Sequence, residues 1–168
     1  MTELPAGKPS MTDRNALIEG FLAANGWGGV ERTPLKGDAS FRRYERLDQD
    51  GRGAMLMDAP PPEDSVDSFV AVARHLKSLG FSAPDIFAQD REGGLLLLED
   101  LGDDTFTRAL DQATPENGVE TGLYQLAVDV LVALHGIASD RVSPPGLARY
   151  DDEKLLEEAF LLTDWTWP

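Results

Sequence analysis

Cysteine is absent from the 168 residues, which excludes disulfide bonds, thiolate zinc sites and thiol catalysis. Apolar runs are also short. The densest, residues 95–98, is far below the roughly 18 residues that a transmembrane helix needs. Residues 1–10 contain acid and proline but no apolar stretch, so no secretory signal is predicted. These absences predict a soluble, cytoplasmic protein with no membrane partner.

Positive charge is scarce, because 15 Lys and Arg residues face 30 Asp and Glu residues, giving a net charge of −15. Such a surface repels phosphate backbones and anionic lipids at long range, so no nucleic-acid partner is expected. The acids are scattered among the bases, which favours a solubilising role. An acidic interaction protein, such as a nucleic-acid mimic, is the alternative, although a mimic would need dense acidic stripes.

Hydrophobic residues make up 42% of the chain, enough for a core of one domain or slightly more. Periodicity and turn residues predict helices over 13–24, 65–79, 105–110, 114–134 and 151–162. They predict strands over 30–35, 41–47, 54–57, 86–88 and 94–99. The first three strands are joined too tightly for helical crossovers, so they should form an antiparallel meander.

The loop between the first two strands is a candidate phosphate site. It comprises Gly37, Asp38, Ala39, Ser40, Phe41, Arg42 and Arg43. Small residues let backbone N–H groups approach phosphate oxygens, and nearby cations neutralise charge. A hairpin turn with ordinary surface arginines explains the same residues about as well. The loop is not a Walker A motif, because neither Gly-Lys-Ser/Thr nor a helix follows the glycine.

A second candidate lies where the apolar strand ends in Glu99, Asp100, Leu101 and Gly102. In a two-lobed kinase such a strand anchors the sheet, and the exposed backbone after it pairs with an adenine edge. The bland interpretation is a core strand that ends in a solvated turn. A change of composition near residues 101–104 marks the predicted boundary between residues 1–101, of which 1–11 form a flexible tail, and residues 102–168.

The order of these features resembles the N-lobe of protein-kinase-like folds. Residues 30–102 look like that lobe in the aminoglycoside phosphotransferase family, through Leu97-Leu98-Glu99-Asp100-Leu101-Gly102 and, further on, Ala133-Leu134-His135. Further runs resemble the bacterial anomeric kinases of N-acetylmuramate and N-acetylglucosamine. These runs are residues 38–44, Met57-Asp58-Ala59-Pro60-Pro61, Tyr150-Asp151-Asp152 and Asp164-Trp165.

The resemblance implies an α+β fold, in which a five-stranded antiparallel sheet with helices is followed by the helical start of a C-lobe. It also implies transfer of phosphate from ATP, with Mg²⁺, to the anomeric hydroxyl of an amino sugar in cell-wall recycling. Residues 37–40 would cover the phosphates, and the backbone of Glu99, Asp100 and Leu101 would meet the adenine. Met57 completes the nucleotide-binding residues that the resemblance implies.

The chain departs from the family pattern on its third strand, which carries no lysine to pair with the α- and β-phosphates. We expect Arg42 or Arg43 to supply that charge. Because side chains alternate along a strand, only one of them can face the cleft.

The catalytic run His-x-Asp-x-x-x-x-Asn is also absent, so no catalytic or metal-binding residue is assigned. His75 and His135 lack its spacing and are interpreted as structural, His75 on the exposed side of its helix. The 168 residues are therefore expected to be inactive alone. Trp165 and Trp167 are interpreted as core residues without their cover, so exposed apolar surface should favour self-association. A non-catalytic nucleotide-binding or regulatory module is the remaining alternative.

Overall fold

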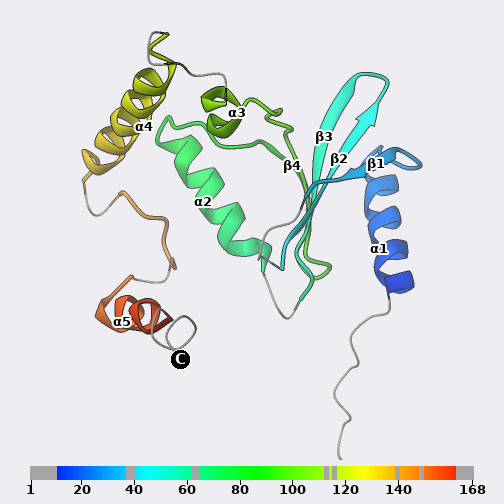
Figure 1. The fold of residues 1–168 in the computed structure, drawn as a ribbon. Coiled ribbons are helices and arrows are strands. Elements are labelled where there is room, and N and C mark those ends of the chain that lie inside the picture. Colours follow the sequence, from blue (N-terminus) through cyan, green and yellow to red (C-terminus); the bar gives the residue numbers. More distant parts are fainter. Residues whose placement is uncertain are drawn as a thin grey trace, which may run out of the picture.

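A computed structural model describes residues 11–36, 41–61, 65–111, 114, 117–138, 141–147 and 150–161. It contains a five-stranded sheet with one helix on each side, followed by shorter helical segments (Figure 1). The helices are α1 (Met11–Ala24), α2 (Val66–Ser78), α3 (Phe106–Leu110), α4 (Val119–His135) and α5 (Asp152–Leu161). The strands are β1 (Glu31–Pro34), β2 (Arg43–Gln49), β3 (Arg52–Asp58), β4 (Ile86–Asp90) and β5 (Leu95–Leu98). The predicted α+β class is confirmed.

The strand order is β1-β2-β3-β5-β4, and every neighbouring pair is antiparallel. The predicted meander of the first three strands is therefore confirmed. The sequence favoured a four-residue turn over 48–51, whereas β2 and β3 continue until only Asp50 and Gly51 remain between them. Both residues have positive φ, 55° and 85°, which suits the tight two-residue turn of a twisted hairpin.

The sheet is buried on both faces, with α1 against one and α2 against the other (Figure 1). The α1-side core contains Ile18, Leu22, Trp27, Leu47, Ala54, Leu56, Leu95 and Leu97. The α2-side core contains Met57, Ala59, Val66, Val70, Leu96 and Leu98. Successive leucines of β5 thus enter opposite cores, which explains why this strand has no polar alternation.

A buried ion pair ties α1 to the end of β3. Arg14 donates to Asp58 Oδ1 from Nε at 3.0 Å and from Nη2 at 2.5 Å, and both residues are less than one-tenth exposed. Arg43 approaches the other carboxylate oxygen, with Nε 3.4 Å from Oδ2. Asp58 is therefore neutralised where the strand leaves the core, and α1 is fixed over its own face of the sheet.

The start of α2 agrees with the prediction, whereas the start of α4 does not. Ser65 caps α2, because its hydroxyl accepts the N–H of Asp67 at 3.2 Å. The prediction that the fourth helix starts at Thr114 is wrong, since α4 begins at Val119. The side chain of Asn117 accepts the N–H groups of Thr114 and Val119, each at 3.1 Å, and Gly118 adopts a left-handed φ of 68°. This turn replaces the first helical turn that the sequence suggested.

The described helices after β5 contain no buried side chain. On α4, Leu126, Val130 and Leu131 are about half exposed, as the expected uncovered apolar face requires. Trp165 and Trp167, named in the same expectation, lie outside the described residues. No helix in the described ranges has the length and apolar character needed to cross a membrane.

His75 lies on the outer side of its helix, as expected, although its ring is partly covered. The side chain of His75 is half-buried, and its Nε2 lies 2.9 Å from the carbonyl oxygen of Arg141. A ring on the outer side of α2 is thus covered by the segment that follows α4. The histidine keeps the structural role that the sequence suggested.

We expect Asp58→Ala to lower the free energy of unfolding of the full-length protein by about 3–5 kcal/mol, because it leaves the Arg14 guanidinium buried without its partner. Removing both charges with Arg14→Met and Asp58→Leu should cost less than the sum of the single changes. Urea unfolding monitored by circular dichroism measures this. Arg91→Gln, which removes an exposed pair with Asp67, is the control and should cost less than about 1 kcal/mol. Equal losses of unfolding free energy in Asp58→Ala and Arg91→Gln would contradict a special role for the buried pair.

Candidate functional site

A groove of about 400 Å³ runs along one side of α2. Its lining comes from the residue just before β2, from α2 and from the segment before β4. The lining residues are Arg42, Ser68, Phe69, Val72, Ala73, Leu76, Ser82, Ala83 and Pro84. Arg42 is the one charged side chain among them. The groove therefore combines largely apolar walls with a single cation, a combination typical of sites for ligands that carry an apolar ring and an anionic group.

Arg42 and Arg43 lie on opposite faces of the sheet, as alternation along β2 predicts. Arg42 lines the groove beside α2. Arg43 is exposed and approaches Asp58, which pairs with Arg14 of α1. Arg42 is thus the arginine positioned to meet a ligand on the α2 face.

The other residues predicted to bind the nucleotide differ in their position and burial. Gly37, Asp38, Ala39 and Ser40 lie outside the described residues. Phe41 is 65% exposed. Met57 is fully buried in the α2-side core, so its side chain supports the packing of α2 against the sheet and has no free surface for a ligand.

No lysine–carboxylate pair joins β3 to α2. The residues of β3 that enter or pack on the α2-side core are Met55 and Met57. The only carboxylate on α2, Asp67, is exposed and pairs with Arg91, whose Nε lies 3.1 Å from Oδ1. Apolar packing therefore lies where protein kinases have a lysine–glutamate ion pair. In the groove, the positive charge comes from Arg42.

The linker after β5 begins with Glu99, which is held against the start of β4. Its N–H donates to the carbonyl of Asp85 at 2.8 Å, and its carboxylate accepts the N–H of Asp85 at 3.0 Å. Leu101 is 63% exposed, and within the described ranges its backbone groups have no hydrogen-bond partner. The linker thus presents unused backbone donors and acceptors at a fixed place beside the sheet.

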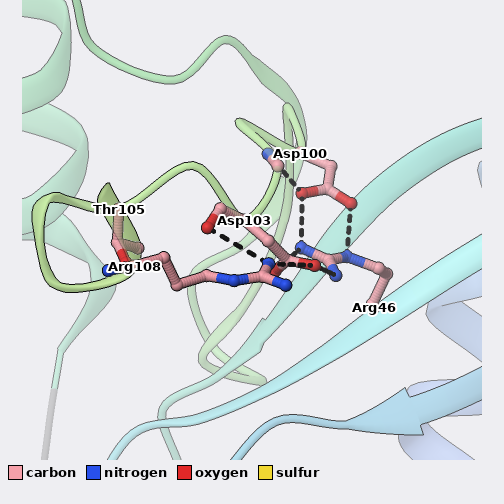
Figure 2. A network of polar contacts seen from close by, with 6 residues as sticks. Arg46, Asp100, Asp103, Thr105 and Arg108 are labelled. Atoms are coloured by element: carbon pink, nitrogen blue, oxygen red, sulfur yellow. Dashed lines mark hydrogen bonds and ion pairs between the residues drawn. The ribbon is translucent and has the colours of Figure 1, made fainter. Parts of the chain in front are cut away.

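Arg46 of β2 holds this linker with its guanidinium (Figure 2). Its Nε and Nη2 donate to the two oxygens of Asp100 at 2.6 and 3.1 Å, and Nη1 and Nη2 donate to those of Asp103, each at 2.9 Å. Asp100 Oδ1 also accepts the N–H of Gly102 at 2.9 Å. The side chain of Asp100, predicted only as part of a nucleotide-binding linker, is therefore committed to shaping that linker.

Sequence reasoning missed Arg46. Pairing places Arg46 opposite Met55, and Met55 opposite Leu98, so the arginine lies in line with the last residue of β5. An arginine in this register, with acids two and five residues beyond Leu98, is the signal that could have identified the contact. That signal requires the strand register, which composition and periodicity do not supply.

Electrostatics reinforce the contact. The hydrogen bonds from Arg46 lower the pKa of Asp103. For Asp100, burial pushes the pKa upward, but the hydrogen bonds from Arg46 and from the N–H of Gly102 outweigh burial and lower the pKa overall. The hydrogen bonds to Asp103 and Asp100 raise the pKa of Arg46. All three groups are therefore charged at neutral pH, and each stabilises the charge of its partners.

Comparison with known proteins assigns the family. The sequence model of the phosphotransferase enzyme family (APH) matches residues 31–166, so the chain belongs to this family. It is 36% identical to an N-acetylmuramate/N-acetylglucosamine kinase of Caulobacter vibrioides, over 92% of this chain and 50% of that protein. Kinases of the same name from Pseudomonas aeruginosa and Pseudomonas putida are 42% and 39% identical, over 86% and 84% of this chain. The relatives are thus phosphotransferases, as the sequence resemblance implied.

The chain spans half the length, or less, of the curated relatives that it matches, with 50% of the Caulobacter protein, 41% of the Pseudomonas aeruginosa protein and 40% of the Pseudomonas putida protein. Within the part of the chain that the structure describes, no three His, Asp or Glu side chains gather closely enough to hold a metal ion. The described residues therefore form a groove and an exposed linker, and they assign no ligands for Mg²⁺.

We expect the stabilisation that Asp100 and Asp103 provide to be complete above their ordinary pKa of 3.8 and to be lost as the pH falls through their lower folded values. The double variant Asp100→Asn, Asp103→Asn should be less stable than the wild-type protein at about pH 6, and this difference should shrink toward about pH 3. Urea midpoints of both proteins across this range measure the effect. A difference that stays constant with pH would contradict the ionic contact.

Proposed function

We propose that this chain is the N-terminal part of an ATP-dependent kinase that phosphorylates the anomeric hydroxyl of N-acetylmuramate or N-acetylglucosamine. Such a reaction belongs to cell-wall recycling. The observation that carries the proposal is the likeness, over more than four-fifths of the chain, to kinases named for these two sugars. The groove beside α2 and the linker after β5 supply places for the nucleotide that are consistent with it.

The described residues fit ATP in two respects. The exposed backbone around Leu101 offers donors and acceptors to the edge of an adenine, while the side chains of Glu99 and Asp100 are held away by their own partners. Arg42, which lines the groove, places a positive charge for phosphate oxygens. The phosphate loop proposed over Gly37–Ser40 is separated from Arg42 by Phe41 alone.

Phosphoryl transfer requires little covalent chemistry from the protein, because positioning and charge neutralisation provide most of the rate enhancement. Mg²⁺, when bound with ATP, would neutralise charge on the β- and γ-phosphates. In this part of the protein, the linker would orient the base and Arg42 would bind phosphate oxygens. No residue of the described ranges is assigned to activate the sugar hydroxyl.

The full-length protein should convert N-acetylglucosamine or N-acetylmuramate and ATP into the sugar 1-phosphate and ADP. Phosphorus NMR identifies the product by the coupling of phosphorus to the anomeric proton. The matched control is the methyl glycoside of N-acetylglucosamine, which has no free anomeric hydroxyl and should give no phosphosugar. Phosphorylation of the glycoside would contradict anomeric transfer, and ADP release without phosphosugar would contradict a sugar kinase.

Arg42→Ala should raise the KM for ATP by about tenfold or more, since a hydrogen bond to a charged group contributes about 1.5–3 kcal/mol. Steady-state kinetics at saturating sugar measure the change. Arg43→Ala is the matched control, because it removes the neighbouring arginine from the opposite face of the sheet. Its KM for ATP should stay close to that of the wild type. An unchanged KM in both variants would rule out an arginine in place of the third-strand lysine.

A further inference from the structure

Arg46 differs from a typical surface arginine, because its side chain is partly buried and its guanidinium is fully engaged by carboxylates. Its side chain is 27% exposed, and its Nε, Nη1 and Nη2 atoms all donate to Asp100 or Asp103. We propose that Arg46 is a positioning residue for the nucleotide, because it clamps both aspartates and so fixes the linker backbone over residues 99–103. The inference rests on the proposed function, which places adenine beside this linker.

The clamp depends on the shape of the guanidinium. Asp100 and Asp103 each receive two hydrogen bonds from one planar group, so the directions of both carboxylates are set together (Figure 2). A lysine carries its charge at a single point and cannot reproduce two forked contacts. The position therefore demands arginine geometry as well as positive charge.

The residues between the two aspartates are held from both sides. Asp100 Oδ1 also accepts the N–H of Gly102, whose φ of +79° turns the chain sharply. Leu101 thus lies at the tip of a short loop whose flanks are fixed, with its side chain 63% exposed. Without the clamp this loop would sample more conformations, and a ligand that uses its backbone would have to order it on binding.

The network continues beyond the linker into α3. The carbonyl of Asp103 accepts the N–H of Thr105 at 2.8 Å and Arg108 Nη1 at 3.3 Å. The hydroxyl of Thr105 in turn accepts the N–H of Arg108 at 3.3 Å and caps α3. Arg46 therefore connects β2, through Asp103, to the start of the first helix after the sheet (Figure 2).

Arg46 and Arg42 belong to different parts of the structure. Arg46 binds two carboxylates of the linker, and Arg42 is part of the lining of the groove. Arg46 is thus suited to hold the backbone that a base would contact, and Arg42 is suited to bind phosphate. The two arginines should consequently act on ATP affinity by different routes.

The chain provides a matched control in Arg32, which clamps two carboxylates on the opposite side of the sheet. Its Nε lies 2.5 Å from Glu45 Oε2, and its Nη1 lies 2.6 Å from Glu19 Oε1 of α1. The side chain of Arg32 is 17% exposed, so it is at least as buried as Arg46. Replacing Arg32 removes a comparable pair of ionic contacts far from the linker.

In the full-length protein, Arg46→Gln should raise the KM for ATP about tenfold and leave kcat within about twofold, as expected when positioning but not chemistry is lost. Arg46→Lys should restore little of this loss. Hydrogen exchange of the ligand-free protein, followed by mass spectrometry, should show faster exchange over residues 100–103 in Arg46→Gln. Arg32→Gln should lower stability with an unchanged KM for ATP.

Asp103→Asn is the milder second variant should Arg46→Gln fold poorly, and it should raise the KM for ATP in the same direction. The effects of Asp103→Asn and Arg46→Gln on the KM for ATP should be less than additive in the double variant. Both changes break the same contact between Arg46 and Asp103. If the wild-type protein binds no ATP, the proposed function fails. If the wild type binds ATP but Arg46→Gln and Asp103→Asn match Arg32→Gln in KM, the positioning role fails while the kinase assignment stands.

Discussion

Burial of β5 on both faces is the constraint on which the rest of the structure depends. Each of its four leucines is at most 3% exposed, and neighbours along the strand enter opposite cores. Two helices must therefore cover the sheet, one from each side, and α1 and α2 do so. The chain can carry polar side chains again only after Leu98. The position of the linker is thus a consequence of hydrophobic packing, and the ionic contacts then refine its shape.

Ionic contacts in this molecule reflect its shortage of cations. With 15 basic residues against 30 acidic ones, an arginine readily finds carboxylate partners. Arg14, Arg32 and Arg46 each bind carboxylates at contacts of 2.5–3.3 Å that join different elements. Arginine suits this use, because its forked donors hold carboxylates in defined directions. Arg42 also lines the largely apolar groove beside α2.

The sequence predicted the order of the elements because periodicity and turn residues are local signals. The two-sided burial of β5 follows from an uninterrupted apolar run, and the α2 cap follows from the residues before Val66. The partners of Arg14 and Arg46 lie 44 and 54 residues away, and no local pattern tells which acid meets which arginine. The start of α4 was missed because Asn117 and Gly118 form a turn immediately before Val119. The candidate linker after β5 stays a prediction, and its contact with Arg46 was not predicted.

The hairpin of β2 and β3 carries a consequence for pairing fidelity. Glu45 and Arg46 are adjacent, yet each joins a clamp on a different face of the sheet. A slip of β2 by one residue would reverse both side chains and would also expel Leu47 from the α1-side core. Glu45 would then face Asp100 and Asp103, and Arg46 would turn toward Arg32. Like charges would meet on both faces, so misaligned hairpins would be rejected electrostatically as well as by loss of packing.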